Sequence, residues 1–424
     1  MKLKTTAFLP FAETLFRTLW LAAFISNIGT WMQNVGVGWL AATFSASPFL
    51  IAMIQTASAL PSLLFSYLAG VIADQMDRRK LLVWLQILLF AVVFFLSLLT
   101  FLKLLNMNIL LVFTFLIGLG TAFTTPVWQA ITPEVVSPNL MKEAIALNGV
   151  NFNLSRAIGP AIGGIILSSW GIQAIFLINA LSFLFLAIGL LRWHDARKAN
   201  VHVTFRTASR EGLKEVRKSV PFRLLLVRTI AFTAFVSAFF ALLPQLSKYI
   251  WAQDSSQYTW LWAAVGAGAL VGSYLYGLWG KYIGAGTVVF GSCLLIAVCF
   301  IGFTLVSTFW PLMTTMFVLG IGWINATSTL NVMAQENSPA AFKARFLAVN
   351  VTVFQGGLAI SSAWWGWLSN HITSLMALRW AGIGMAICAI LINRFMPVES
   401  KPLPGDAVAC ADPLLQYQLD EPSQ

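Results

Sequence analysis

The chain has 424 residues, of which 58% are hydrophobic and 10% are charged, and its mean hydropathy is +0.80. Soluble domains typically carry about 25% charged residues, so this composition indicates lipid as the main solvent and excludes an ordinary soluble protein. The net charge is +11, but the chain has only three histidines and four cysteines without a C-x-x-C pair, so neither a disulfide framework nor a metal or cofactor site is expected.

Twelve segments are long and apolar enough to cross a bilayer as helices, for which about 20 residues are needed. In chain order, the predicted spans are 17–43, 48–73, 81–104, 107–131, 141–168, 172–192, 222–249, 256–280, 285–307, 309–333, 344–369 and 373–395. The apolar run after Arg17 is too long for a cleavable signal, so the first span should remain in the protein. The sequence therefore predicts an all-α integral membrane protein.

The longest gap between spans divides the chain into six helices plus six. Residues 193–221 are basic, include R-E-G-L-K-E-V-R-K, and are expected to form a cytoplasmic linker with an amphipathic helix. We expect an N-terminal bundle over 1–192 and a C-terminal bundle over 222–396. Residues 397–424 contain several prolines and an acidic bias, which predicts a disordered cytoplasmic tail.

Basic residues orient the predicted spans. If both termini are cytoplasmic, nearly all of the 26 lysines and arginines fall in cytoplasmic segments, and only Arg156, Arg228 and Arg379 fall inside spans. This distribution is a positive-inside bias. It accounts for the basic charge, so the expected partner is the lipid bilayer and nucleic-acid binding is not expected.

A short repeat relates the two halves. The stretches S-P-N-L-M-K-E-A-I-A-L-N at 137–148 and S-P-A-A-F-K-A-R-F-L-A-V-N at 338–350 each open the fifth helix of their half. Parallel six-helix repeats around a central cavity are a known transporter architecture. The repeat therefore favours two pseudo-symmetric bundles around a cavity.

Polar side chains concentrate in a few spans, whereas the third and ninth spans are almost wholly apolar. Polar residues within a membrane are expected to face water or protein, so they are candidates for a substrate cavity. The candidates are Asn27, Thr30, Gln33, Asn34, Thr125, Gln129, Asn148, Asn151, Arg156, Asn325, Asn331 and Gln355. The alternative is that these groups only join helices by hydrogen bonds.

The loop after the second span carries the sequence G-V-I-A-D-Q-M-D-R-R-K. It resembles the signature loop of the major facilitator superfamily, G-x-x-x-D-R-x-G-R-R-K. The matching and flanking positions are Gly70, Asp74, Asp77, Arg78, Arg79 and Lys80. Gln75 and Asp77 depart from the usual basic residue and glycine. We expect Asp74 to cap the next helix or hold a group across the interface, and the basic triplet to lie at anionic headgroups.

Further stretches extend the resemblance along nearly the whole membrane region. They are W-M-Q-N-V-G at 31, T-P-V-W-Q-A at 125, A-L-N-G-V-N-F-N-L-S-R-A-I-G-P at 146, N-A-L-S-F at 179 and V-F-Q-G-G at 353. Together they resemble the branch of bacterial exporters known as transmembrane secretion effectors, which includes the enterobactin exporter. The resemblance implies twelve helices, alternating access and outward movement of siderophores or other small organic molecules.

The fifth span contains Gly159, Pro160, Gly163 and Gly164. They resemble the G-P-x-x-G-G core of the motif found in the fifth helix of proton-coupled antiporters. Proline lacks the amide hydrogen that would bond the carbonyl of Arg156, and the glycines permit close helix packing. We interpret the segment as a gate helix, with static packing as the alternative.

Arg156 is placed about 15 residues into its helix, roughly 22 Å from the start, which is too deep for easy snorkelling. No Asp, Glu or His falls in the middle of a predicted span. Its partner is therefore expected to be carbonyls, amides or water, or else an anionic substrate. The same absence leaves open whether a proton is coupled to transport, because antiport usually uses a titrating group in the cavity.

These observations predict a secondary active transporter of the bacterial inner membrane, acting as a monomer. The expected cargo is a small polar or anionic organic molecule, siderophore-like or drug-like, moved outward by alternating access. The alternative is an importer of a metabolite or ferri-siderophore. An enzyme is not expected, because no nucleophile or acid–base group lies at depth, and no G-x-x-x-x-G-K-[ST] loop indicates an ATP motor.

Overall fold

The computed structural model describes residues 6–193, 214–279, 282–339 and 342–396. Within them the chain forms twelve helices of 18 residues or more, in agreement with the predicted number. The predicted tail at 397–424 and residues 194–213 of the linker lie outside the described residues, while residues 214–218 of the linker are helical.

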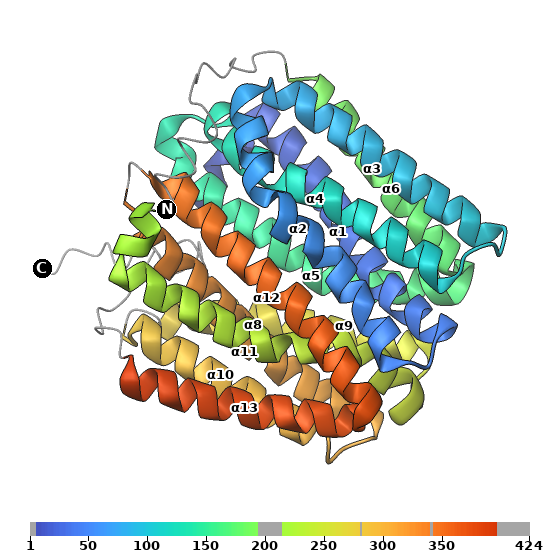
Figure 1. Cartoon of the computed structure of the whole chain (residues 1–424). Coiled ribbons are helices and arrows are strands. Elements are labelled where there is room, and N and C mark those ends of the chain that lie inside the picture. The colour runs from blue at the N-terminus through green and yellow to red at the C-terminus, as the bar shows by residue number, and fades with distance from the viewer. Residues whose placement is uncertain (1–5, 194–213, 280–281, 340–341, 397–424) are drawn as a thin grey trace, which may run out of the picture.

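The N-terminal half begins with a short 3₁₀ helix and continues with six long helices (Figure 1). They are η1 (Thr6–Ala12), α1 (Thr14–Phe44), α2 (Pro48–Gln75), α3 (Arg78–Phe101), α4 (Met107–Val135), α5 (Met141–Trp170) and α6 (Ile172–Leu191), with the 3₁₀ turn η2 (Pro138–Leu140) before α5.

The C-terminal half repeats this order with six more long helices. They are α8 (Val220–Gln245), α9 (Ser255–Trp279), α10 (Ala285–Gly302), α11 (Phe309–Glu336), α12 (Lys343–His371) and α13 (Ser374–Phe395). The π-helical turn η3 (Leu246–Ile250) extends α8 at its C-terminal end.

Side-chain caps and prolines set several helix starts. Asp77 accepts a hydrogen bond from the amide of Lys80 at 3.1 Å, and Asn106 accepts one from the amide of Ile109 at 3.0 Å. Pro48 occupies the first position of α2, where a missing amide hydrogen costs nothing. Gly171, at φ +78°, supplies the left-handed turn that joins α5 to α6.

Among the described residues, ten helices are long and apolar enough to cross a membrane, and α1 and α5 are the two long helices outside that group. The amides of α1, and the amides, glycines and Arg156 of α5, lower their hydropathy. Such helices need shielding from lipid by their neighbours. α5 obtains it by packing against α1 in its own half and α9 in the other.

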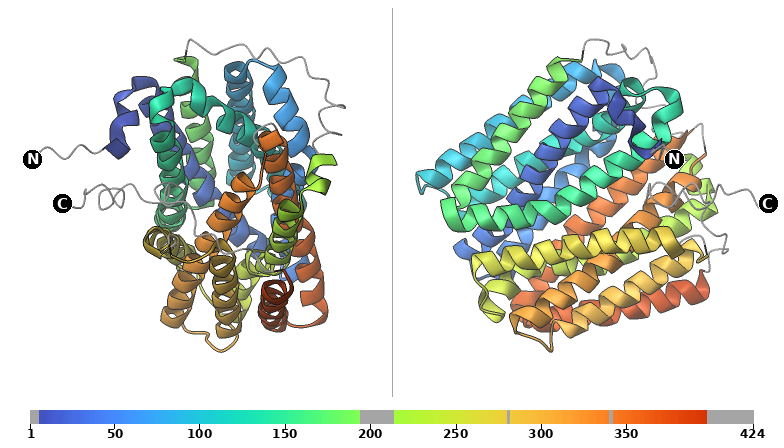
Figure 2. Two further views of the ribbon diagram at one scale, coloured as in Figure 1. Left: turned by 90° about the vertical axis from the view of Figure 1, so that its left-hand side faces the viewer. Right: turned by 180° about the vertical axis from the view of Figure 1, so that it is seen from behind.

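The two halves join through equivalent helices. α2 packs along α12, and α5 packs along α9, so in each pair the second helix of one half meets the fifth helix of the other. Figure 1 and the reverse view in Figure 2 show the halves approaching each other away from the two termini. The arrangement is the pair of six-helix bundles predicted from the sequence.

Contacts at this converging end close one side of the junction. The carbonyl of Ala42, in the last turn of α1, accepts hydrogen bonds from Tyr249 at 2.7 Å and Lys248 at 3.1 Å, both in η3. A Cβ atom on Gly366 of α12 would lie 2.4 Å from the Cβ of Ala52 in α2. Backbone is therefore in close contact across the junction at this end.

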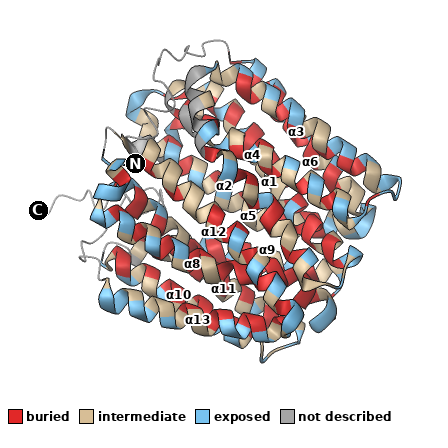
Figure 3. Cartoon of the chain, in the orientation of Figure 1, coloured by how far each residue is buried: buried red, intermediate tan, exposed pale blue. Residues whose placement is uncertain are grey.

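Outer helices expose apolar side chains, as expected for a surface in lipid. Trp84 and Phe95 of α3 are 71% and 55% exposed, and Trp380 of α13 is 59% exposed. Figure 3 shows buried residues concentrated where helices face one another. The N-terminal half has two apolar clusters, one around Leu82 and one around Phe176.

Candidate substrate site at the junction of the halves

A layer of amide side chains crosses the N-terminal half and joins α1 to α5 and α6. Asn27 donates to Asn151 at 2.9 Å, and Asn151 donates to the carbonyl of Trp20 at 3.0 Å. The buried amide of Asn179 donates to Gln33 at 2.6 Å. The candidates Asn27, Gln33 and Asn151 thus hydrogen-bond within the N-terminal half and fix the position of α1.

The small residues Ser155, Gly159 and Gly163, four residues apart along α5, lie on one face of the helix and pack against α1. Ser155 donates to the carbonyl of Phe24 at 3.4 Å. A Cβ atom on Gly159 would lie 2.7 Å from the Cβ of Trp31, and one on Gly163 would lie 3.4 Å from the Cα of Met32. These two glycines therefore serve close packing within the N-terminal half.

Gly164 faces the other half instead. A Cβ atom there would lie 2.3 Å from the hydroxyl oxygen of Thr259 in α9. About two turns earlier along α5, Gly266 of α9 approaches so closely that a Cβ would lie 2.3 Å from the Cα of Ala157 and 2.8 Å from the carbonyl oxygen of Arg156. Pro160 offers that carbonyl no amide hydrogen. α5 and α9 thus cross beside Arg156.

The guanidinium of Arg156 lies among three aromatic rings. Its central carbon is 4.8 Å from the ring centre of Trp31, 5.1 Å from that of Phe152 and 5.8 Å from that of Trp323. Trp31 and Phe152 belong to the N-terminal half and Trp323 to the C-terminal half. These distances are within the range of cation–π attraction. Arg156 therefore lies where the two halves meet.

Aromatic contacts do not satisfy the hydrogen-bonding capacity of Arg156. Its Nε and Nη1 atoms are buried and have no acceptor in the structure. An unpaired buried donor costs roughly 1–3 kcal/mol, and more when the group is charged. A bound acceptor, above all an anion, would recover that free energy.

Trp323 connects this site to an aromatic wall in the C-terminal half. Its ring centre lies 4.7 Å from that of Phe240, 5.6 Å from that of Phe232 and 6.4 Å from that of Phe354. The Oδ1 atom of Asn325, two residues along α11, is buried and has no hydrogen-bond partner. The junction thus combines a cation with extended aromatic surface, whereas Asn325 lies on a different face of α11 from Trp323.

The other cavity candidates are dispersed. The hydroxyls of Thr30 and Thr125 bond carbonyls of their own helices at 2.9 Å, and Asn148 donates to Thr132 at 3.4 Å. Asn34 and Asn331 are exposed, and Gln355 is half-buried. The side chain of Gln129 lies outside the described residues.

The signature loop makes contacts that differ from the expected ones. Asp77 caps α3, whereas the side chains at positions 70 and 74 lie outside the described residues. Arg78 pairs with Glu134 at the end of α4, and Arg79 donates to the carbonyls of Leu190 and Leu191 at the end of α6. Two of the three basic residues thus bind protein groups, while Lys80 is exposed.

The sequence interpretation did not single out the three rings around Arg156. Phe152 could have been found, because it precedes Arg156 by four residues and so lies on the same helix face. Trp323 carries no such local signal, because its contact depends on how α11 packs in the other half.

The fold is that of the major facilitator transporters. The nucleoside transporter NupG has a TM-score of 0.72 at 12% identity, covering 90% of this chain and 100% of that chain. A bacterial homologue of the human lysosomal transporter Spinster, in an inward-facing and unoccupied conformation, has a TM-score of 0.67 at 13% identity, covering 98% and 99%.

The family model described as transmembrane secretion effector matches residues 5–423, so the chain belongs to this family of membrane transporters. The enterobactin exporter EntS of Shigella flexneri is 25% identical, covering 89% of this chain and 90% of that protein. The macrolide efflux protein A of Streptococcus pyogenes is 24% identical, covering 63% and 67%. The staphyloferrin A transporter of Staphylococcus aureus is 29% identical, but the match covers only 39% of this chain and 42% of that protein.

Proposed function

We propose that this protein is a secondary active exporter of a small polar or anionic organic molecule, siderophore-like or drug-like. The observation that carries the proposal is the uncompensated cation of Arg156 at the junction. It favours an anion over a cation, since none of the described ion pairs involves Arg156.

Two similar proteins support the proposal that the cargo is an organic molecule and that it is exported. EntS is an enterobactin exporter, and macrolide efflux protein A is an efflux protein. The uncompensated arginine favours the siderophore-like cargo of the first. Import of a metabolite or ferri-siderophore is the alternative.

The packing of the halves supports alternating access. We place the protein in a bacterial inner membrane with both termini in the cytoplasm. The end of the junction that is closed by Ala42 and Tyr249 then lies on the outer side of that membrane. The described conformation then faces inward, where an exported substrate would enter. We propose that a bound anion satisfies Arg156 and changes the relative stability of the inward and outward states.

Two carboxylates at the cytoplasmic end are candidates for coupling proton movement to transport. The carboxylates of Glu134 and Glu143 each have one buried oxygen without a hydrogen-bond partner, at the cytoplasmic end of α4 and α5. We propose that one of these two carboxylates, and not a mid-membrane acid, binds the coupling proton. We also propose that the protein acts as a monomer.

Binding to the purified protein tests the cargo class. A citrate-based siderophore, a catecholate siderophore and a cationic macrolide would be titrated against wild type, Arg156→Gln and Arg156→Lys. Arg379→Gln is the control, because Arg379 is exposed and bonds Thr304 far from the junction. We expect an anionic ligand to bind wild type and Arg379→Gln, and to lose at least about tenfold in affinity in Arg156→Gln.

Normal binding by Arg156→Gln together with poor folding would show a structural role and contradict this assignment. Cells lacking the protein test direction. Accumulation of the bound molecule inside such cells is expected for an exporter, whereas reduced uptake of the same molecule would favour the importer.

A further inference from the structure

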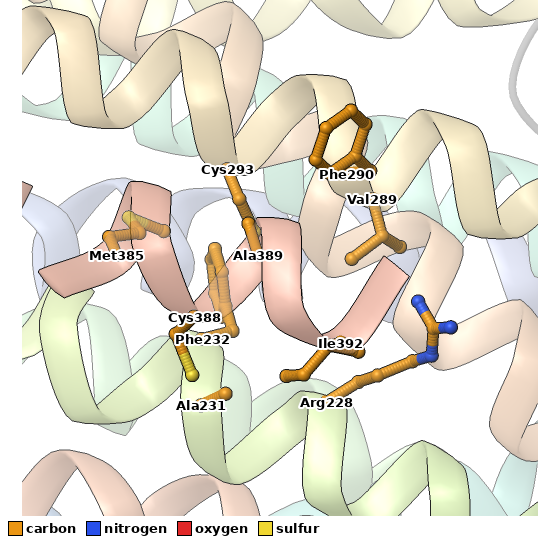
Figure 4. Close-up of a pocket in the computed structure, with 10 residues that line it drawn as sticks. All are labelled: Arg228, Ala231, Phe232, Val289, Phe290, Cys293, Met385, Cys388, Ala389 and Ile392. Carbon is orange, nitrogen blue, oxygen red and sulfur yellow. The ribbon is translucent and has the colours of Figure 1, made fainter. Parts of the chain in front are cut away.

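A crevice lies within the C-terminal half, on helices other than those that hold Arg156, and it shares only Phe232 with the aromatic wall around Trp323. α8, α10 and α13 enclose it, and Figure 4 shows Arg228 at one end and Met385 and Cys293 towards the other. Its lining residues are Arg228, Ala231, Phe232, Val289, Phe290, Cys293, Met385, Cys388, Ala389 and Ile392. Apart from Arg228, the walls carry only apolar and sulfur-containing side chains.

Arg228 is almost completely buried, with 4% of its surface exposed. Its Nη2 atom donates to the carbonyl of Met396, just beyond the end of α13, at 2.5 Å. Its Nε atom is buried and has no acceptor. One hydrogen bond to a neutral carbonyl leaves the positive charge uncompensated, although buried charges are normally paired.

The enclosing helices supply no counter-ion. α8, α10 and α13 are described in full and contain no aspartate or glutamate, whereas α8 and α13 carry Arg223, Arg228, Arg379 and Arg394. Arg223 and Arg394 are exposed at the same end of the helices as Arg228. The helix N-termini of α8 and α10 lie at this end too and add partial positive charge, while the C-terminus of α13, whose Met396 carbonyl binds Arg228, adds partial negative charge but no formal counter-ion. The anion must therefore come from outside the three helices.

The surroundings of the crevice are those of a lipid-facing surface. Val227 and Ile230 on α8 are 39% and 51% exposed, and Ile390 and Leu391 on α13 are 52% and 49% exposed. Arg228 is eight residues into α8, about 12 Å from the start of the helix. At this depth a side chain lies near the boundary between the lipid headgroups and the first acyl carbons. The crevice has a volume of about 20 Å³, room for one water-sized group, so a phosphate would have to approach Arg228 from the open side, along which the rest of a longer ligand would lie.

We propose that this crevice binds one anionic phospholipid, whose phosphate pairs with Arg228 while an acyl chain lies along the apolar mouth between α8 and α13. Guanidinium and phosphate form strong charge-assisted hydrogen bonds. Basic pockets between membrane helices on the cytoplasmic side are suited to such headgroups. A soluble anion would satisfy the arginine equally well but would gain nothing from the apolar walls.

Native mass spectrometry of the full-length protein released from detergent tests the site. Phosphatidylglycerol and phosphatidylcholine with identical acyl chains would be added to wild type, Arg228→Gln and Arg223→Gln. Arg223 is the matched control, because it is an exposed arginine on the same helix. We expect phosphatidylglycerol adducts several-fold above phosphatidylcholine adducts in wild type and Arg223→Gln, and equal low levels in Arg228→Gln.

A second variant covers the case in which Arg228→Gln does not fold. Ala389→Phe keeps the arginine and fills the mouth, and it should also abolish the preference for phosphatidylglycerol. Retention of that preference in either folded variant would overturn the proposal. Glycerol 3-phosphate or inorganic phosphate binding as well as the lipid, with loss in Arg228→Gln, would identify a soluble-anion site and overturn it too.

Discussion

Arg156 and Trp323 face each other across the junction, with the guanidinium carbon 5.8 Å from the ring centre. Arg156 moves with the N-terminal half, together with Trp31 and Phe152, whereas Trp323 moves with the C-terminal half. A separation of the halves at this level would break the contact with Trp323 and the close packing of Gly266 on Ala157, whereas the contacts with Trp31 and Phe152 would remain. Arg156 thus contacts both halves, and two of its buried nitrogen atoms have no acceptor.

Replacing Trp323 by phenylalanine should weaken anion binding about two- to fivefold. Phenylalanine keeps an aromatic ring in the wall but attracts the cation less, and an exposed cation–π contact contributes about 0.5–1 kcal/mol. Ligand titration of the purified variant measures the effect. Trp365→Phe is the control, because Trp365 is equally buried but bonds the carbonyl of Ala234. An equal loss in both variants would mean that general packing, and not Arg156, is responsible.

The α5–α9 crossing makes Gly266 a sensitive position. A methyl group there would meet backbone atoms at 2.3 to 2.9 Å, so Gly266→Ala must push the helices apart. Overpacking of this kind costs about 1–3 kcal/mol, and we expect a fall of several degrees in the thermal midpoint in detergent. Gly291→Ala provides the comparison, because a Cβ atom there meets nothing within 4 Å. Equal midpoints for the two variants would show that the crossing is looser than described.

The sequence was sufficient for the architecture because ten of the twelve long helices carry enough apolar length by themselves, and α1 and α5 have spanning length despite their polar residues. It also identified the glycines of α5 as sites of close helix packing, since a residue without a side chain permits close approach whatever helix covers it. It could not say that Gly159 and Gly163 meet α1 while Gly164 meets α9, because that depends on how helices distant in the chain are placed. The capping of α3 by Asp77 rather than Asp74 similarly depends on where α2 ends.

The buried bond between Asn179 and Gln33 should contribute measurably to stability. Asn179→Leu leaves the buried side-chain oxygen of Gln33 without its donor, at a cost of about 1–3 kcal/mol. Asn34→Leu, at an exposed neighbour of Gln33, should leave stability unchanged. Thermal unfolding of both variants decides the matter. If Asn34→Leu proves as destabilising as Asn179→Leu, the amide layer has no special role.

The closed end of the junction should open when the bonds to Ala42 are removed. Tyr249 and Lys248 both donate to this single carbonyl, and Lys248 also lies 5.8 Å from the ring centre of Trp39. The combined variant Tyr249→Phe and Lys248→Met loses both bonds, each contributing about 0.5–3 kcal/mol, and should populate the outward-open state.

Access to this end can be measured with Ala42→Cys, which keeps the carbonyl, in a protein whose native cysteines are replaced. The rate of labelling by a membrane-impermeant maleimide should rise several-fold in the combined variant. Tyr282→Phe is the control, because Tyr282 is 81% exposed and lies at the opposite end of the C-terminal half. An unchanged labelling rate would show that apolar packing, such as that of Gly366 on Ala52, holds this end closed without the two hydrogen bonds.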